Sequence, residues 1–296
     1  MPILNGMPIP SFAVVVCFLA WTLCLPAGEP LVFDDDALGE MFSKKLGTIA
    51  QNGDSLDIQS AVAELDATAG KRIPLPRCDG PGPITDIASL YTQCVPAVVA
   101  IGSVYKCEKC SDWHQEGFAT GWIVSEEGLV MTNAHVFEGD EKEVLGVITH
   151  DGRVFPIKEV LAADKSGDAA VFRIATEGAS LPCLKFADSA APGEEVTVIS
   201  HPSGRLFSLT SGKISRFHRQ HTEEGESTTW MSVTADFAVG SSGGPVLNAQ
   251  GEVVGMVSST LTAYSEESAD TSPASDVQMV FKDCVPLAVL RGLFEP

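Results

Sequence analysis

Basic residues are scarce in this sequence of 296 residues. It contains 19 lysines and arginines against 39 aspartates and glutamates, which gives a formal net charge of -20. A chain this acidic repels phosphate backbones, so we expect no nucleic-acid partner. Intrinsic disorder is excluded as well, because only 20% of the residues are charged while 45% are hydrophobic, enough for a folded core.

The apolar stretch near the start is too short for a typical membrane span. Ser11–Leu25 is shorter than the roughly 20 residues that cross a bilayer, and small residues follow at Ala27 and Gly28. We therefore expect residues 1–27 to be an export signal, although the first ten residues lack the lysine or arginine of a typical signal. A retained membrane anchor and a buried core segment are the alternatives. The signal and the anchor both predict a secreted or periplasmic protein of the cell envelope.

Two of the eight cysteines lie in this N-terminal stretch, and six follow it. An even number outside the cytoplasm favours disulfide bonds, but the sequence does not choose among the many pairings. The six are Cys78, Cys94, Cys107, Cys110, Cys183 and Cys284. Cys107 and Cys110 form a Cys-x-x-Cys pair with His114 nearby, a spacing that zinc sites also use. Because a single pair is weak evidence and export favours a disulfide, we expect no metal and no cofactor.

The sequence also lacks internal repeats and long low-complexity tracts, and its character changes near residue 84. Residues 28–83 are mixed and acidic, with Pro- and Gly-rich linkers and helical spacing over Ser55–Ala69. We predict that they form an N-terminal extension. Whether its helix packs on the main domain or belongs to a mobile pro-segment stays open.

Residues 84–296 are predicted to form one domain of short strands with flanking helices at Ile84–Gln93 and Val285–Phe294, and with a polar loop at Ser265–Ser275. Such strands, separated by Gly, Asp, Asn and Pro, favour an antiparallel barrel or sandwich over a βαβ protein. The expected strands are Ala97–Val104, Ala119–Val124, Leu129–Thr132, Val144–Thr149, Val154–Val160, Ala169–Ile174, Glu195–Ile199, Ser208–Ile214, Thr229–Thr234, Val246–Leu247 and Val253–Ser258.

The strongest local signal for chemistry is Gly240-Ser241-Ser242-Gly243-Gly244-Pro245. A serine hydroxyl needs a neighbouring base to act as a nucleophile, and it needs donors for the oxyanion that its attack creates. Glycine at position 240 lets backbone N–H groups converge on one point. We therefore predict Ser242 as the nucleophile and an oxyanion hole over Gly240, Ser241 and Ser242, with the N–H groups of Gly240 and Ser242 as its donors. An ordinary Gly/Ser turn is the alternative.

Two further motifs could supply the base and its partner. His135, in Thr132-Asn133-Ala134-His135-Val136, follows an apolar run that predicts a strand end. Asp168 directly precedes the run Ala169–Ile174, where its carboxylate could fix the tautomer of the imidazole. Asp164, further from that strand, is a weaker rival. The order His, Asp, Ser is that of the chymotrypsin class rather than of the subtilisin or α/β-hydrolase classes.

Together these motifs resemble the trypsin-like peptidases of the HtrA/DegP type. The resemblance extends from about residue 85 to about residue 260 and includes Pro96–Val99 and Gly117–Val124. It implies an all-β fold of two six-stranded antiparallel chymotrypsin-like barrels, with the active site in the cleft between them. It also implies general-base, orienting and nucleophilic roles for His135, Asp168 and Ser242. The chain departs from the family in having Ser241 where Asn is common, and we expect no PDZ module after the protease domain.

Three residues are candidates for substrate binding. Asp236 lies six residues before Ser242, the offset of the specificity acid in trypsin-like proteases, where it would select Lys or Arg. A structural role for Asp236 is the alternative. His201, in Ser200–Gly204, could instead favour an acidic side chain. Ser258 lies in a segment that resembles the strand on which substrate backbone adds by β-pairing.

The sequence thus predicts an exported serine endopeptidase that hydrolyses peptide bonds of polypeptide substrates through an acyl-enzyme. One alternative is a protease-fold binding or chaperone-like protein with little proteolytic activity. Another is a zinc-stabilised interaction protein centred on Cys107 and Cys110.

Overall fold

The computed structural model describes residues 31–107, 109–110, 112–137, 144–221, 227–264 and 277–295. The predicted export signal (1–27) and the predicted loop Ser265–Ser275 lie outside the described residues. None of the described helices has the length and apolar character needed to cross a bilayer.

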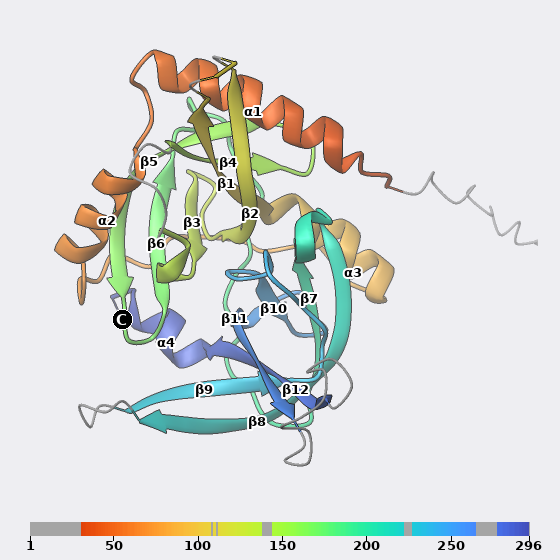
Figure 1. The fold of residues 1–296 in the computed structure, drawn as a ribbon. Helices are drawn as coiled ribbons and strands as arrows, with labels where there is room; N and C mark the ends of the chain where they lie inside the picture. Colours follow the sequence, from red (N-terminus) through yellow and green to blue (C-terminus); the bar gives the residue numbers. More distant parts are fainter. Residues whose placement is uncertain are drawn as a thin grey trace, which may run out of the picture. The chain divides into compact units, whose positions relative to one another are not determined.

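The described strands form two closed antiparallel barrels of six strands each (Figure 1), which confirms the predicted double-barrel fold. Neighbouring strands follow the order β1-β2-β3-β6-β5-β4 in the first barrel and β7-β8-β9-β12-β11-β10 in the second. The first barrel consists of β1 (Val98–Lys106), β2 (Trp113–Ile123), β3 (Leu129–Thr132), β4 (Val144–Thr149), β5 (Val154–Asp164) and β6 (Ala169–Ile174). The second consists of β7 (Glu195–Ser200), β8 (Ser208–His221), β9 (Ser227–Val233), β10 (Pro245–Leu247), β11 (Val253–Tyr264) and β12 (Val277–Pro286).

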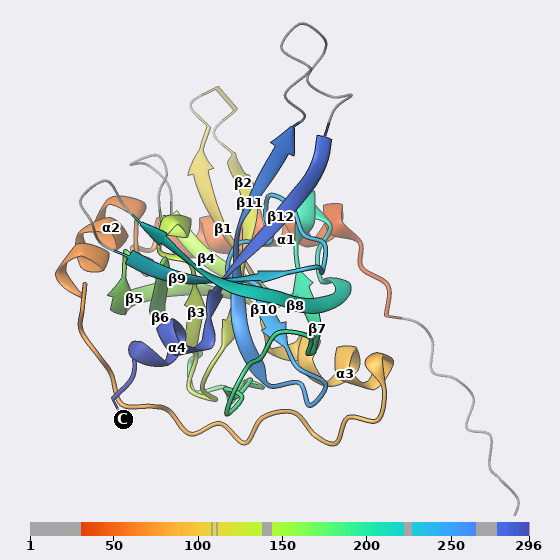
Figure 2. The ribbon, with the colours of Figure 1, turned by 90° about the horizontal axis from the view of Figure 1, so that it is seen from below.

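Strands β3, β4 and β6 have the predicted bounds, whereas β2, β8 and β11 are longer than predicted. Two of the longer strands belong to the hairpins β1–β2 and β11–β12, which project from the same side of the molecule (Figure 2). Strand β12 was not predicted. Its first residues are exposed rather than alternately buried, so they lack the pattern by which a strand is found.

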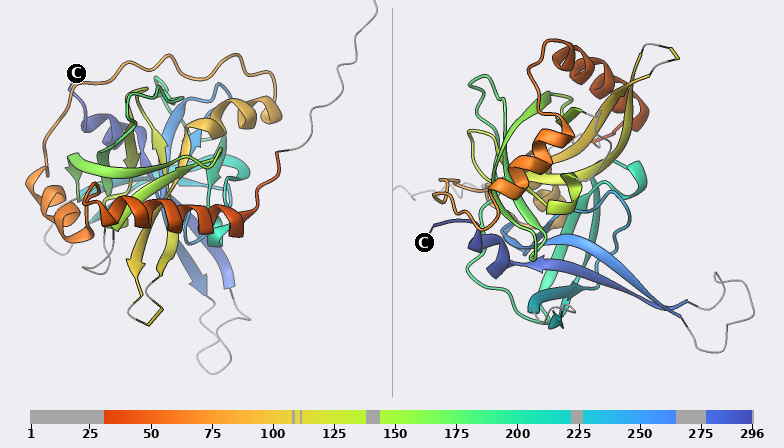
Figure 3. Two further views of the ribbon diagram at one scale, coloured as in Figure 1. Left: turned by 90° about the horizontal axis from the view of Figure 1, so that it is seen from above. Right: turned by 60° about the vertical axis from the view of Figure 1, so that its left-hand side comes forward.

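Helix α1 (Asp35–Gln51) was not predicted either. It begins after Asp34, whose side chain accepts a hydrogen bond from the Ala37 N–H at 3.0 Å, and acidic residues in its first turn favour the positive end of the helix dipole. The helix lies across the first barrel (Figures 1 and 3). Its Phe42 and Leu46 side chains are completely buried there.

Two glycines of the first barrel make room for these side chains. A β-carbon at Gly102 of β1 would lie 2.9 Å from the Phe42 ring, and one at Gly146 of β4 would lie 2.7 Å from the Leu46 side chain. Helix α1 therefore packs into the barrel surface at positions where only glycine leaves enough space.

Helix α2 (Ile58–Ala67) falls within the predicted helical segment and packs on β5. The Glu64 carboxylate accepts the backbone N–H of Val160 at 2.7 Å. All residues from Phe33 onward belong to one compact unit, so the packing does not break at the predicted boundary near residue 84. Of the two alternatives for the predicted helix, packing on the main domain is the one observed. Two further helices, α3 (Ile87–Cys94) and α4 (Leu287–Gly292), flank the barrels.

One disulfide, between Cys78 and Cys183, joins the segment that follows α2 to the segment between the barrels. This confirms the expectation of disulfide bonding for one pair of the described cysteines. Cys94 and Cys284 are free and buried. Burial raises the pKa of Cys94 to about 12 and raises that of Cys284 well above its ordinary value, so both remain uncharged thiols of low reactivity.

Candidate active site

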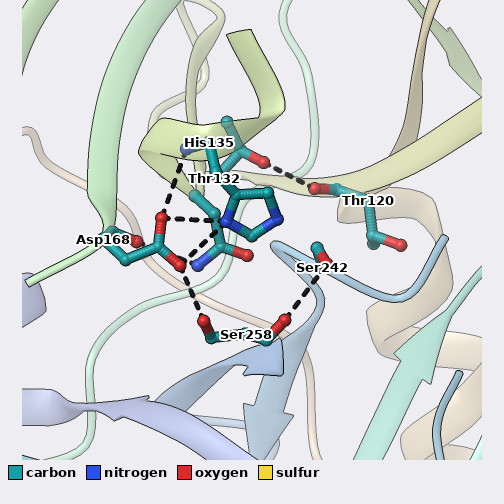
Figure 4. A network of polar contacts seen from close by, with 7 residues as sticks. Thr120, Thr132, His135, Asp168, Ser242 and Ser258 are labelled. Atoms are coloured by element: carbon teal, nitrogen blue, oxygen red, sulfur yellow. Dashed lines mark hydrogen bonds and ion pairs between the residues drawn. The ribbon is translucent and has the colours of Figure 1, made fainter. Parts of the chain in front are cut away.

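The first barrel contributes a histidine and an aspartate in direct contact. His135 lies in a short 3-10 turn (Ala134–Phe137) that follows β3, and Asp168 lies between β5 and β6. The Nδ1 atom of His135 is 3.0 Å from each carboxylate oxygen of Asp168, and its backbone N–H donates to Oδ1 at 3.2 Å (Figure 4). The carboxylate therefore orients the imidazole through one ring nitrogen, Nδ1.

The backbone of Asp168 has a left-handed conformation, with φ of 54°. Aspartate tolerates this conformation better than most residues, but it still needs support from its surroundings. The Nδ2 atom of Asn133 donates to the Asp168 carbonyl at 2.9 Å and supplies that support. The rival carboxylate, Asp164, caps the same turn, because its Oδ1 accepts the Gly167 N–H at 2.8 Å.

The second barrel contributes two serines beside this pair. Ser258, on β11, donates its hydroxyl to Asp168 Oδ2 at 2.6 Å, and its carbonyl accepts the Ser242 hydroxyl at 3.2 Å (Figure 4). Ser242 and His135 line one cleft of about 450 Å³. The structure thus brings the three predicted catalytic residues together, with Ser258 between Asp168 and Ser242. The Asp168 side chain is 16% exposed and that of His135 43%, so the acid is shielded while the imidazole faces solvent.

Thr120 of the first barrel fastens the loop that carries Ser242. Its backbone N–H donates to the Ser242 carbonyl and its Oγ1 to the Gly240 carbonyl, each at 2.8 Å. Gly240 and Gly243 have φ of 93° and 86°, in the left-handed region that favours glycine. A β-carbon at Gly243 would also collide with the Thr120 carbonyl. The loop therefore needs glycine at these two positions for conformation and for space.

Two N–H groups of this loop are candidates for an oxyanion hole. The Val239 carbonyl accepts the Ser203 N–H at 2.7 Å, and the Ser241 N–H donates to Ala238 at 2.9 Å. Within the part of the chain that the structure describes, the N–H groups of Gly240 and Ser242 donate to no carbonyl of the backbone. This corrects the inclusion of Ser241 among the oxyanion-hole residues, because its N–H already has a partner.

The structure does not bring His201 into the cleft. Its side chain is completely buried, and its Nδ1 accepts the Phe207 N–H at 2.9 Å. Burial lowers the pKa of His201 to about 4, because the charged imidazolium is disfavoured away from water. The predicted contact of this histidine with an acidic substrate side chain is therefore wrong, since the ring serves the core.

Asp236 does not line the cleft either. Its side chain is 89% exposed and lies 3.8 Å from the Lys282 ammonium, while its carbonyl accepts the Thr210 hydroxyl at 2.6 Å. These contacts agree with the structural alternative rather than with the acid of a closed specificity pocket.

A second cluster of chemically capable residues lies near the tip of the β1–β2 hairpin. The sulfur atoms of Cys107 and Cys110 and a ring nitrogen of His114 all lie within 4.8 Å of one another. The Cys110 sulfur is 3.0 Å from His114 Nε2. Two sulfurs and an imidazole at this separation could hold a metal ion.

The double barrel, with a histidine–aspartate pair and a serine at one cleft, defines a trypsin-like peptidase domain. Residues 119–256 match that family, as the motifs predicted. In this half of the chain the protein is related to HtrA/DegP-like serine proteases.

Three curated relatives show the extent of the relationship. A protein named HhoB from Synechocystis sp. is 35% identical over 49% of this chain and 35% of its own length. A probable periplasmic serine endoprotease, DegP-like, from Halomonas elongata is 37% identical over 50% of this chain and 30% of its own length. The mitochondrial serine protease HTRA2 of Drosophila pseudoobscura pseudoobscura is 33% identical over 49% of this chain and 34% of its own length. The chain thus spans about a third of the length of these relatives.

Proposed function

We propose that the protein is an exported serine endopeptidase that hydrolyses peptide bonds of polypeptide substrates. One observation carries this proposal: His135 is held by Asp168 through Nδ1 in the same cleft that Ser242 lines. A shielded carboxylate, an imidazole that it orients and a serine whose loop can offer backbone N–H groups to an oxyanion are the parts that acyl transfer requires.

In the proposed mechanism, His135 removes the proton of the Ser242 hydroxyl as its oxygen attacks the carbonyl carbon of the scissile bond. The N–H groups of Gly240 and Ser242 stabilise the oxyanion of the tetrahedral intermediate. His135 then gives the proton to the leaving amine, which departs and leaves an acyl-enzyme. Water, deprotonated by His135, releases the acyl group, and the proton returns to Ser242. Asp168 stabilises the imidazolium in both stages.

Export is the second part of the proposal. The Cys78–Cys183 disulfide is typical of an oxidising compartment outside the cytoplasm. The Halomonas relative is named as periplasmic, and the apolar N-terminal stretch has the character of an export signal. Cell fractionation and N-terminal sequencing test this part: we expect an envelope or secreted protein that begins near residue 28. A cytoplasmic protein with an intact N-terminus would contradict it.

Labelling with a fluorophosphonate probe tests the enzymatic part. We expect the wild-type protein to be labelled at Ser242 and to cleave peptides of a random library, whereas Ser242→Ala does neither. Peptide mapping identifies the labelled serine. A folded wild-type protein that resists the probe and leaves the library intact would overturn the proposal in favour of a binding or chaperone-like role.

A further inference from the structure

The N-terminal helix α2 contributes to the cleft that contains His135 and Ser242. Its first residue, Ile58, lines this cleft. The chain just before it is fixed to the first barrel, because the Leu56 N–H donates to the Ile157 carbonyl at 3.0 Å and the Leu56 carbonyl accepts the Leu145 N–H at 3.2 Å. The Asp57 side chain caps the helix through the Ser60 N–H at 2.7 Å. Ile58 is therefore positioned as firmly as the barrel residues beside it.

The position of the cleft indicates which part of a substrate would occupy it. It includes Phe118 and Ala119 of β2 and Val136, next to the imidazole, but it does not include Ser258. In the proposed mechanism, His135 gives its proton to the leaving amine, so the part of the substrate after the scissile bond must pass close to the imidazole. The acyl part, in contrast, would run along the β11 strand at Ser258. The cleft thus lies on the leaving-group side.

Apolar side chains line much of the cleft on this side, and the carboxylate-bearing Glu116 lines it as well. Ile58 of α2, Leu145 of β4 and Ile101 of β1 face it together with Val136. A volume of about 450 Å³ is enough for one or two side chains of a bound peptide. An apolar side chain that enters this space leaves water, and this gain favours it over glycine or a charged residue.

We infer that the N-terminal segment is part of the substrate-binding machinery: Ile58 and Leu145 form an apolar subsite for a residue that follows the scissile bond. This inference rests on the proposed function and names the kind of substrate that the site prefers, a polypeptide with an aliphatic or aromatic residue just after the cut. It also makes residues 56–58 a permanent wall of the cleft rather than part of a removable inhibitory segment.

The experiment starts from a peptide that the wild-type protein cleaves and varies the residue after the cut among Leu, Phe, Gly and Asp. The readout is the ratio of kcat/KM for the Leu peptide to that for the Gly peptide. This ratio does not depend on the fraction of correctly folded enzyme, so a partly unfolded variant remains informative. We expect a wild-type ratio of about 10 to 100, the range that an apolar pocket gives.

Ile58→Ala should lower this ratio about tenfold, because the subsite loses most of one wall. Ile58→Phe should narrow the subsite and shift the preference from the Phe peptide toward the Leu peptide. Val62→Ala is the matched control, because Val62 lies on the same helix with 37% exposure and does not line the cleft. It should keep the wild-type ratio.

Two results would overturn the inference while the proposed function stands: a wild-type enzyme without apolar preference after the cut, or an unchanged ratio in Ile58→Ala. Failure of the proposed function looks different. In that case the wild-type protein itself neither cleaves peptides nor reacts with a fluorophosphonate.

A separate observation supports a metal site at the β1–β2 hairpin. The structure closes one disulfide, Cys78–Cys183, but leaves Cys107 and Cys110 as free thiols. The two sulfur atoms form no disulfide with each other. They and a ring nitrogen of His114 all lie within 4.8 Å of one another. The Cys107 N–H donates to the Asp112 carbonyl at 2.9 Å and closes the turn. The His114 ring stacks on the Tyr105 ring, with 5.8 Å between the ring centroids.

We propose that Cys107, Cys110 and His114 bind Zn²⁺. Two soft sulfur ligands and an imidazole select zinc over hard cations, and three protein ligands leave one position for water. This reverses the sequence-based expectation of a disulfide at this pair, because the structure adds a histidine nitrogen in contact with Cys110.

Metal analysis of the purified full chain tests this site. We expect about one zinc per wild-type chain, and a thiolate charge-transfer band when Co²⁺ replaces it. Both should be lost in Cys110→Ser and strongly reduced in His114→Ala, but retained in Cys284→Ala, which removes a buried thiol elsewhere. A metal-free protein in which mass spectrometry finds a Cys107–Cys110 disulfide would overturn the assignment, and so would zinc that survives Cys110→Ser.

Discussion

Among the described residues, a serine, a histidine and an aspartate come together at two places. The first lies between the barrels, where Asp168 contacts His135 and Ser242 lines the same cleft. There the aspartate takes its hydroxyl hydrogen bond from a separate residue, Ser258, at 2.6 Å. The Ser242 hydroxyl therefore does not donate to the carboxylate of Asp168.

The second grouping lies within the second barrel, on β8, β9 and β12. The Ser232 hydroxyl donates to Asp283 at 2.6 Å and lies 3.4 Å from His218 Nδ1, while the second carboxylate oxygen of Asp283 is 3.9 Å from His218 Nε2. The His218 and Asp283 side chains are only 16% and 7% exposed. These contacts join three neighbouring strands of the barrel.

The difference shows that arrangement, and not residue type, makes such a grouping suitable for catalysis. In the second grouping the serine hydroxyl donates to the carboxylate and not to the histidine, and Ser232 and Asp283 are buried. In the first, the carboxylate holds the imidazole and the serine faces a cleft. We therefore expect matched substitutions in the two groupings to separate activity from stability.

The largest contrast should come from the two serines. Ser242→Ala removes the proposed nucleophile and should lower kcat about 10⁶-fold, the order seen when an acyl-transfer nucleophile is deleted. Ser232→Ala should leave kcat unchanged. Initial rates with a cleaved peptide and probe labelling measure both variants. Loss of activity in Ser232→Ala with an intact fold would mean that the second grouping takes part in the reaction.

Substitution of the two aspartates should change kcat almost as differently as substitution of the two serines. Asp168→Asn should lower kcat about 10⁴-fold, because an amide favours the wrong tautomer of His135. Asp283→Asn should keep the activity but lower the free energy of unfolding by about 1–3 kcal/mol, because the Ser232 hydroxyl loses a charged acceptor. Rate measurements and urea unfolding of the same preparations check this pair. Equal loss of activity in both variants would contradict the division into a catalytic and a structural grouping.

The sequence predicted much of the first grouping, because each residue lies in a local motif. The bounds of β3 and β6 were also predictable, since short apolar runs with turn residues at their ends mark them. What the sequence did not reveal depends on contacts between distant segments. Helix α1 buries Phe42 against Gly102, and Ile58 reaches the cleft because Leu56 pairs with β4 and β5. No local pattern contains these contacts.

His201 shows the same limit at a single residue. The segment Ser200–Gly204 has the composition of an exposed loop, and so its histidine was a candidate for substrate contact. The ring is nevertheless turned into the core, where it accepts the Phe207 N–H and packs against the Phe207 ring, with 4.7 Å between the ring centroids. Only the three-dimensional packing distinguishes this buried histidine from one in the cleft.

A third prediction follows from the complete burial of this histidine. The pKa of His201 is about 4 in the folded protein, against an ordinary 6.5. Between about pH 4 and pH 6.5 the histidine is therefore protonated in the unfolded chain but neutral in the folded protein. Stability should therefore fall by about 3 kcal/mol as the pH drops from about 6.5 to about 4. Urea unfolding across this range should show a smaller decrease for His201→Gln. A variant with the wild-type pH dependence would contradict the prediction.

The smallest expected effect concerns Ser258, whose hydroxyl, and not that of Ser242, donates to the carboxylate of Asp168. Ser258→Ala removes the hydrogen bond to Asp168 but keeps the backbone carbonyl that faces Ser242 and the substrate strand. Hydrogen bonds to charged groups contribute about 1.5–3 kcal/mol, and we expect about a tenfold loss of kcat with KM unchanged, because Asp168 is held less firmly.

Ser258→Thr restores a hydroxyl and should recover most of the rate, which a general packing defect would not allow. If Ser258→Ala instead raised KM and left kcat unchanged, the residue would act only on substrate binding, as its resemblance to a substrate-pairing strand first implied. The first grouping would then need no separate partner for its carboxylate. The availability of the Ser242 hydroxyl would have to come from the glycine loop alone, since Thr120 fixes that loop from the opposite barrel.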